Sequence, residues 1–339
     1  MNTKSIDAIA NAVLYEGYML YPYRLSSVKN RQRFNFGVLY PQSYSEAQSG
    51  SDAWSMQTEC IVQGDAAAIE VRVRFLKLVS RTVRAVKEMP SSGFSLDSES
   101  TPWQEAIECE ISVPVRDLKR LTAAPVDWEF YFPAKEETEC TRDENGRTVE
   151  MIRRKQQSLR GSVDINATRL AEDLFKLRVS VKNLTPLHDA APTTRDSALM
   201  QSLVSAHTLL GVADGHFVSL LEPPDDLKQI AASCRNIGTW PVLVGAEGEC
   251  DTMLSSPIIL YDYPQIAPES PGDLFDGTEI DEILALRILT MTDEEKREMR
   301  NTDDRARRIL ERTESLPMEH LAKLHGTLRE LRPLKEEMP

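Results

Sequence analysis

Residues 67–83, "AAIEVRVRFLKLVSRTV", determine the expected fold of the chain. Apolar side chains at Ile69, Val71, Val73 and Phe75 alternate with charged side chains at the positions between them. A period of two places successive side chains on opposite faces of an extended strand, so that one face is buried and the other is solvated. The stretch therefore predicts a long β-strand with a core on one side.

The same alternation recurs over the first half of the chain, and "DENGR" at 143–147 is typical of a hairpin turn. Several antiparallel strands at this spacing are typical of a β-sandwich, in which each strand buries one face between two sheets. We therefore expect an α+β chain with a mainly antiparallel, β-sandwich-like body. Further strands are expected at 55–62, 106–115, 126–134, 146–159, 160–170 and 172–187.

Helical patterns flank this body. Ser5 is a candidate N-cap for a short helix that ends near Gly17, with apolar residues at helical spacing between them. Thr292 and Glu295 form a capping-box pattern, and the chain after residue 278 is expected to be helical.

The region from residue 198 to the acidic loop mixes both patterns. Asp214-Gly215 lies between two apolar runs and predicts a hairpin, 225–236 predicts a short helix, and 239–245 and 252–262 predict strands. The expected organisation has four parts: an N-terminal helix with a basic-aromatic segment (1–50), a β-sandwich-like domain (51–190), a mixed β/α region ending in an acidic, proline-rich loop (191–277), and a helical C-terminal segment (278–339).

Charge and hydropathy limit the partners and the compartment. The chain carries 53 acidic and 40 basic residues, a net charge of −13, which repels nucleic acid and anionic lipid. No apolar run approaches the roughly 18 residues that a membrane-spanning helix needs, and the N-terminus lacks a signal-peptide pattern. We expect a cytoplasmic protein without nucleic acid as a partner and without membrane insertion.

Cysteine and histidine spacing gives no sign of a metal site. The five cysteines are widely spaced without a CxxC pair, which predicts reduced thiols, and the five histidines include no HxxxH or HxH pair. GxSxG, GxxxxGK[ST] and HExxH are also missing. We expect no cofactor and no metal, and the catalytic residues, if there are any, are unknown. A composite site assembled from distant histidines and cysteines stays open.

The loop 261–276, "YDYPQIAPESPGDLFD", is a candidate docking surface for another protein. Its three prolines limit the freedom of the free loop, so less entropy is lost on binding, while aromatic side chains supply contact area and carboxylates attract a basic partner. The alternative is a tight crossover that packs its own tyrosines onto the body. The candidate contact residues are Tyr261, Asp262, Tyr263, Glu269, Asp273, Phe275 and Asp276.

A second candidate surface lies in the basic-aromatic segment near the N-terminus, because arginine offers planar donors and aromatic rings offer faces. The alternative is that residues 34–40, "FNFGVLY", form a strand and that the basic residues are its solvated approach. The candidate contact residues are Tyr21, Tyr23, Arg24, Arg31 and Arg33.

Seven stretches carry a resemblance over nearly the whole chain: "VLYEGYMLYPYR" (13–24), "KNRQRFNFGVLYP" (29–41), "QTEC" (57–60), "LFKLRVSVKNLTPL" (174–187), "GHFVSLLEPP" (215–224), "CRNIGTWPVLVG" (234–245) and the segment 255–300. Together they resemble a bacterial family with no assigned activity, whose members tend to be encoded beside uptake nickel–iron hydrogenase subunits and their maturation factors. The resemblance implies a role in hydrogenase assembly or operation, and it implies no catalytic residue.

The leading hypothesis is a non-enzymatic accessory or assembly protein whose partner is a nickel–iron hydrogenase subunit or a maturation factor. One alternative is a metal-dependent hydrolase or cofactor-processing enzyme that uses the carboxylates of 262–282 with His207 or His216. Another alternative is a structural subunit of a larger complex.

Overall fold

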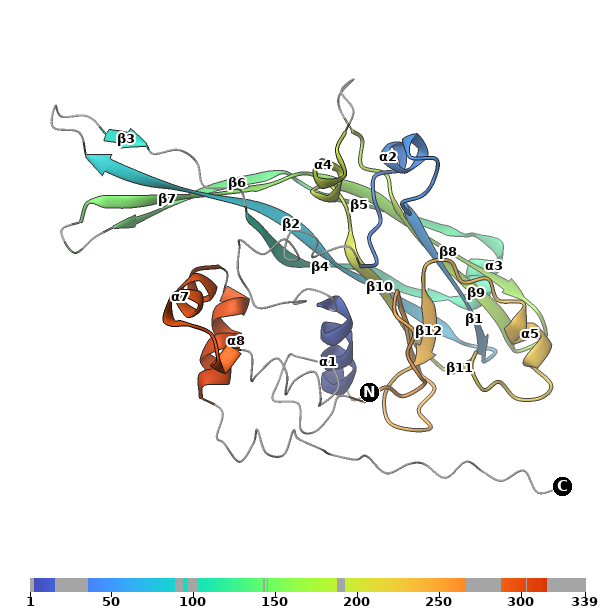
Figure 1. The fold of residues 1–339 in the computed structure, drawn as a ribbon. Coiled ribbons are helices and arrows are strands. Elements are labelled where there is room, and N and C mark those ends of the chain that lie inside the picture. The colour runs from blue at the N-terminus through green and yellow to red at the C-terminus, as the bar shows by residue number, and fades with distance from the viewer. Residues whose placement is uncertain are drawn as a thin grey trace. The chain divides into compact units, whose positions relative to one another are not determined.

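The computed structural model describes residues 3–15, 36–88, 94–96, 103–142, 144, 146–187, 193–265, 288–302 and 304–315. The chain divides into two compact units, one formed by residues 1–18 and 32–264 and the other by 19–31 and 265–339. All strands of the described part belong to the first unit (Figure 1).

Two antiparallel sheets form the body of the first unit, which confirms the predicted α+β class with a sandwich-like β body. The smaller sheet has the order β11 (His216–Val218), β1 (Ser55–Gln63), β9 (Leu174–Asn183), β8 (Leu159–Arg169) and β5 (Val126–Phe132).

The larger sheet runs in the order β12 (Trp240–Leu243), β13 (Thr252–Ser256), β10 (Val204–Ala213), β2 (Ala68–Glu88), β7 (Thr148–Gln156) and β6 (Lys135–Arg142). Two further strands, β3 (Phe94–Leu96) and β4 (Trp103–Asp117), also pair with β2. Because β10 and β13 pair into the sheet that contains β2, the segments 51–190 and 191–277 contribute to one sheet.

The core between the sheets follows the alternation of β2. Val71, Val73 and Phe75 are at most 1% exposed and pack with apolar residues of the smaller sheet, including Val163 and Leu177. Each such side chain contributes about 1.5–3 kcal/mol when it is fully buried. The predicted inward face of β2 is therefore confirmed.

The second half of β2 leaves this core. β10 pairs with β2 only along residues 68–76, whereas β7 pairs with residues 79–85, so the end of β2 continues with β7 and β6 as an antiparallel arm (Figure 1). All eight residues of β6 are exposed. The sequence "KEETECTR" has no apolar alternation, which is why strand β6 was not predicted.

Charged cross-strand contacts hold the arm together in place of an apolar core. Arg154 contacts Glu105 and Glu139, each at 2.9 Å, and Arg153 contacts Glu136 at 2.6 Å. Opposite charges on neighbouring strands each contribute a few tenths of a kcal/mol to about 1 kcal/mol.

Helix α1 (Thr3–Leu14) covers the larger sheet with its apolar face, and it contacts β10 and β2. The helix agrees with the prediction, but it begins at Thr3, so Ser5 lies inside it and the predicted N-cap is wrong. Gly17 lies outside the described residues. The buried apolar positions are Ile6, Ile9, Ala10, Val13 and Leu14.

The predicted strand 34–40 is wrong in its described part. Only an isolated bridge between Leu39 and Leu203 forms there. Gly37 has a φ of +51°, which interrupts an extended conformation, and a Cβ at this position would lie 2.4 Å from Cγ of Pro257. The close approach to Pro257 therefore requires glycine and ends the extended run.

The predicted hairpin at Asp214-Gly215 is also wrong. The strand before it, β10, pairs with β2 and β13, while the strand after it, β11, pairs with β1 of the other sheet. A Cβ at Gly215 would lie 2.7 Å from the carbonyl oxygen of Gln63. This glycine permits a close crossing between sheets, and local sequence could not distinguish that role from a hairpin.

The second unit contains α7 (Asp293–Thr302) and α8 (Asp304–Glu314). The predicted capping box is confirmed, because the Thr292 amide donates to Glu295 Oε2 at 2.6 Å and the Glu295 amide donates to Thr292 Oγ1 at 3.3 Å. The predicted helical residues 278–287 and 316–339 lie outside the described part. The helices share an apolar cluster of Ile288, Met291, Met299, Ile309 and Leu310.

Four short helices complete the first unit: α2 (Gln42–Ala47), α3 (Leu118–Ala123), α4 (Arg195–Leu199) and α5 (Lys228–Ala232). Helix α5 confirms the short helix predicted at 225–236. No helix among the described residues has the length and apolar character needed to cross a membrane.

Candidate functional site

Three of the twelve predicted contact residues, Tyr261, Asp262 and Tyr263, are described by the structure. They lie on the segment that follows β13 and returns along β12. The other nine lie outside the described residues: Glu269, Asp273, Phe275, Asp276, Tyr21, Tyr23, Arg24, Arg31 and Arg33.

Asp262 and Tyr263 bind their own chain. Asp262 accepts hydrogen bonds from the Leu243 amide at 2.7 Å and from the Ser219 hydroxyl at 2.5 Å. The Tyr263 amide donates to the Leu243 carbonyl at 2.7 Å, and burial raises the pKa of Tyr263 to about 12. These contacts match the crossover alternative for these two residues, because they fasten the segment to the outer edge of β12.

Tyr261 has the opposite environment, since its side chain is 86% exposed. Trp240 lies opposite Ser256 in the β12–β13 pair, and the chain continues from Ser256 through Ile259 and Tyr261 back to β12. We name the exposed apolar residues Ile237, Trp240, Ile259 and Tyr261 the β12-edge surface; their exposed fractions are 52%, 45%, 76% and 86%.

The exposed apolar side chains of the β12-edge surface make it a candidate site for binding another protein. A single exposed apolar side chain is ordinary, whereas these four are carried by β12 and by the two segments that precede it and return to it, which makes them candidates for a binding surface. Tryptophan and tyrosine are also the residues that most often dominate the energy of protein interfaces.

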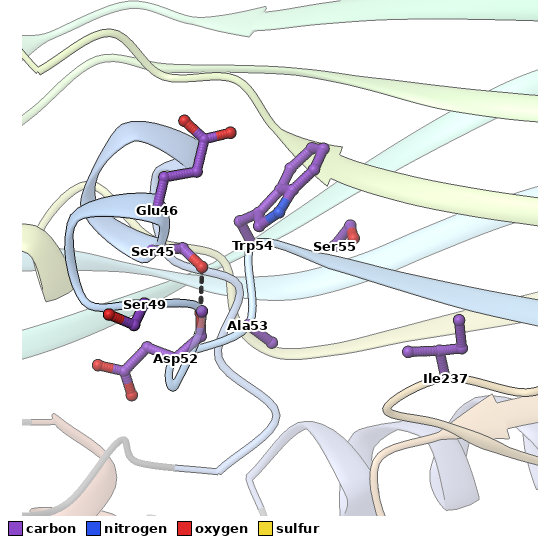
Figure 2. A pocket seen from close by; sticks show the side chains of 9 residues that line it. Ser45, Glu46, Ser49, Asp52, Ala53, Trp54, Ser55 and Ile237 are labelled. Carbon is purple, nitrogen blue, oxygen red and sulfur yellow. Dashed lines mark hydrogen bonds between the residues drawn. The ribbon is translucent and has the colours of Figure 1, made fainter.

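A pocket of about 500 Å³ borders this surface (Figure 2). It forms where α2 and the connection to β1 meet the loop before β12. Ile237 belongs to both the pocket and the β12-edge surface, and its backbone pairs with Gln57 of β1 through hydrogen bonds of 2.9 and 3.0 Å. The lining residues are Ser45, Glu46, Ser49, Gly50, Asp52, Ala53, Trp54, Ser55 and Ile237.

Local bonds fix the pocket wall. The Ser45 hydroxyl donates to the Asp52 carbonyl and closes the loop between α2 and β1 (Figure 2). Ser49 and Gly50 both have positive φ, +59° and +73°, which turns the chain there. Sequence reasoning missed this pocket, because neither of its two segments carries a motif and only the fold brings them together.

The side chains on the wall are also held. Glu46 accepts a hydrogen bond from Gln42 Nε2 at 2.8 Å. Asp52 contacts the Arg195 guanidinium at 3.2 Å, and that guanidinium lies 5.6 Å from the ring centre of Tyr40. The pocket thus combines two carboxylates, three serine hydroxyls and three apolar side chains, Ala53, Trp54 and Ile237.

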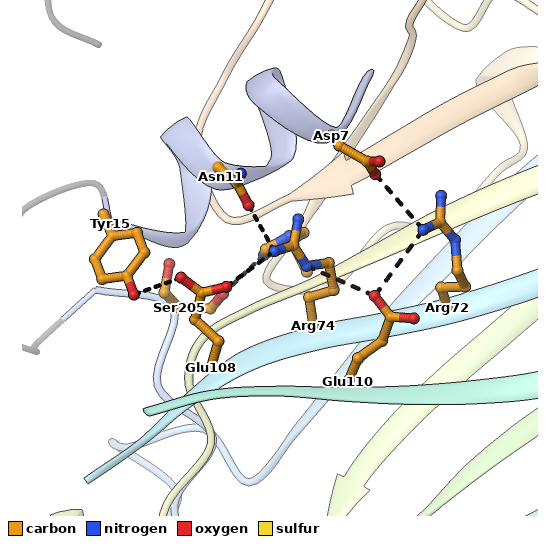
Figure 3. A network of polar contacts seen from close by, with 9 residues as sticks. Asp7, Asn11, Tyr15, Arg72, Arg74, Glu108, Glu110 and Ser205 are labelled. Carbon is orange, nitrogen blue, oxygen red and sulfur yellow. Dashed lines mark hydrogen bonds and ion pairs between the residues drawn. The ribbon is translucent and has the colours of Figure 1, made fainter. Parts of the chain in front are cut away.

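A second polar cluster lies between α1 and the larger sheet (Figure 3). Arg74, of which 9% is exposed, donates to Asn11 Oδ1 at 2.6 Å and contacts Glu108 at 3.4 Å. The Tyr15 hydroxyl donates to Glu108 at 2.6 Å, and Arg72 contacts Asp7 at 3.6 Å. Three of these contacts join the N-terminal segment to β2 or β4, and the Arg74–Glu108 contact joins these two strands to each other, so the cluster positions α1 on the sheet.

His207 lies on the same face and is fully buried. Its Nδ1 is 2.9 Å from the carbonyl oxygen of Ser205, and its Nε2 has no partner within the described residues. Burial lowers the pKa of His207 to about 4, so the ring is neutral at pH 7. The neutral ring donates through Nδ1 to the carbonyl, which is a structural role.

The residues named for an enzyme are not brought together in the described part. His207 is buried below α1, His216 is exposed at the start of β11, and Asp262 is bonded to its own chain. Among the residues that the structure describes, no three histidine, cysteine, aspartate or glutamate side chains gather as ligands for a metal. The carboxylates after residue 265 lie outside the described part.

All five cysteines are free. Burial between the sheets raises the pKa of Cys109 to about 11. Alternation along β4 turns its neighbours Glu108 and Glu110 to the opposite face, toward Arg74.

Comparison with protein-family models finds none that matches the chain, and no curated protein matches it. Its function is therefore inferred from its own residues and their geometry.

Proposed function

We propose that the protein is a non-enzymatic accessory or assembly protein that binds another protein. The observation that carries this proposal is the β12-edge surface, where Ile237, Trp240, Ile259 and Tyr261 are between 45% and 86% exposed. Burying an aromatic side chain removes about 150–250 Å² from water. At about 25 cal/mol per Å², this amounts to several kcal/mol per side chain before the costs of association.

The backbone that carries this surface is already held in place. Asp262 and Tyr263 bind Leu243 of β12, so Tyr261 projects from an ordered segment. A surface that is ordered before binding loses less entropy when a partner docks. Pro241 lacks an amide hydrogen, and the Leu243 amide and carbonyl are both bonded, which disfavours strand addition at this edge. Recognition by side chains is therefore favoured.

The proposed partner is a nickel–iron hydrogenase subunit or maturation factor in the cytoplasm. The resemblance of the sequence supports this identity, and the net charge of −13 favours a basic or neutral partner over an acidic one.

Pull-down with purified hydrogenase subunits and maturation factors tests the proposal. Replacing Trp240 and Tyr261 together by alanine should lower the affinity for the partner by roughly tenfold or more, because each is expected to act as a hot spot. Tyr131→Ala is the matched control, since Tyr131 is 65% exposed on β5 of the smaller sheet. Unchanged capture by the double variant would refute docking at this surface, and failure of the parent protein to capture any of these candidates would refute the hydrogenase partner.

A second candidate, a structural subunit of a larger complex, is favoured by the arm of β2, β6 and β7. Strand β6 is exposed along its whole length, so the arm offers a large area outside the core. Residues 138–153 can be replaced by a two-residue Asn-Gly turn, because Glu137 and Arg154 lie opposite each other in the β6–β7 pair. If the protein is such a subunit, the shortened protein stays folded but no longer co-elutes with the native complex. Unchanged co-elution refutes this role for the arm.

A further inference from the structure

We infer that the pocket beside the β12-edge surface binds a lysine or arginine side chain of the protein partner. The inference rests on the proposed function and adds to it the chemistry of the partner: a basic residue placed close to an apolar anchor.

The charges at the pocket favour a cation. Its lining contains two carboxylates, Glu46 and Asp52, and no lysine or arginine. Asp52 is neutralised in part by Arg195 at 3.2 Å. Glu46 is bonded to the amide of Gln42 at 2.8 Å, and an amide carries no charge, so Glu46 supplies a net negative charge at the pocket. The overall charge of −13 adds to the attraction for a cation and repels an anionic ligand.

The apolar lining suits the stem of the same side chain. Trp54 and Ile237 lie on the pocket wall (Figure 2). Lysine and arginine have long apolar stems that pack against apolar surface while their charged ends reach polar groups. Tryptophan is also the aromatic residue that binds cations best through its ring face. A neutral apolar ligand would use only half of this lining, because it leaves the carboxylates without a partner.

The position of the pocket links it to the docking surface. Ile237 lines the pocket and also belongs to the β12-edge surface, and Trp240 follows three residues later. A partner that covers Trp240 and Tyr261 can therefore place a neighbouring basic side chain in the pocket. The pocket wall is held by the Ser45–Asp52 bond and by the backbone pairing of Ile237 with Gln57, so it is largely formed before binding.

Titration of the full chain with three small probes tests this inference. The probes are N-acetyl-lysine methylamide, its uncharged analogue N-acetyl-norleucine methylamide, and N-acetyl-glutamate methylamide. The indole N–H signals of the four tryptophans report binding by NMR, with the signal of Trp54 identified from a Trp54→Phe variant. We expect saturable shifts of the Trp54 signal with the lysine probe alone, and we expect these shifts to weaken as salt is added.

Glu46→Gln should weaken binding of the lysine probe by roughly threefold, the effect of one exposed ion pair. The matched control is Glu247→Gln, an exposed carboxylate outside the pocket, which should leave binding unchanged. Equal shifts with the norleucine probe, shifts with the glutamate probe, or no shift of Trp54 with the lysine probe would each overturn the inference.

This result is distinguishable from the test of the proposed function. If the lysine probe binds at Trp54 while the Trp240 and Tyr261 double variant still captures its partner, the cation pocket stands and the docking surface fails. If the probe does not bind while the double variant loses capture, the docking surface stands and the cation pocket fails.

Discussion

A protein in which His207 is replaced should lose less stability than the parent protein when the pH is lowered. The imidazole is fully buried, it donates through Nδ1 to Ser205, and its Nε2 has no partner within the described residues. Burial is the main cause of its low pKa, and the nearby Arg74 guanidinium also disfavours a positive ring.

The direction and the size of this change in stability with pH follow from the pKa values of His207 in the folded and unfolded states. In the unfolded chain His207 titrates near its ordinary pKa of 6.5, and in the folded protein near 4. Between these values the unfolded state binds more protons, so the free energy of unfolding falls as the pH falls, and above about pH 6.5 the residue has no such effect. With 1.36 kcal/mol per pKa unit, the stability lost by pH 4.5 is about 2.5 kcal/mol.

Urea unfolding of the parent and of His207→Asn at pH 7.5 and pH 4.5 measures this effect. The variant should be less stable at pH 7.5, because a buried ring is replaced by a smaller side chain. Between the two pH values it should lose about 2.5 kcal/mol less stability than the parent. His216→Asn is the matched control, because His216 is exposed, and it should lose as much stability as the parent.

The comparison of losses, instead of absolute stabilities, removes the effect of carboxylates that titrate in the same range in all three proteins. An equal loss for His207→Asn and the parent would show that His207 is not held neutral in the folded state. The assignment of a buried, structural histidine below α1 would then be wrong.

Three further substitutions test the packing. Lys77→Met should raise the free energy of unfolding at pH 7 by about 1 kcal/mol, because Lys77 is only 2% exposed and burial lowers its pKa; a less stable variant in urea would contradict this. Gly215→Ala should lower the free energy of unfolding by about 1–3 kcal/mol, because its Cβ would lie 2.7 Å from a backbone oxygen. Gly146→Asn is the control in thermal unfolding and should change the stability little, because a Cβ at Gly146 has nothing within 4 Å. Ser255→Ala should cost about 1–3 kcal/mol, because two buried threonine hydroxyls bond to Ser255 at 2.7 Å, and unchanged stability would refute that network.

Local sequence was enough to predict the features that depend only on residues close together in the chain. The alternation in β2 predicted its buried face, because a strand turns successive side chains to opposite sides whatever it pairs with. The capping box at Thr292 and Glu295 was predictable for a similar reason, since both bonds lie within four residues. The antiparallel, sandwich-like class followed from many such strands in sequence.

Pairing between distant segments was decided only by the tertiary structure. Asp214-Gly215 has the residues of a hairpin, but its two strands belong to different sheets, because β11 satisfies its backbone bonds on β1. Strand β6 has no apolar pattern and exists because β7 pairs with it and cross-strand charges attract. Local propensity cannot supply this information, since the partners lie elsewhere in the chain.

The candidate site shows the same division. The sequence identified Tyr261, Asp262 and Tyr263 as one docking group, but only the fold separates exposed Tyr261 from Asp262, which bonds to Leu243 and Ser219. The pocket depends on residues 45–55 meeting Ile237, about 180 positions later, through one backbone pairing. Sequence alone named some side chains that could bind a partner. Tertiary contacts decided which of them bond to their own chain and which face solvent, because a polar group that is bonded internally is not free to bind a partner.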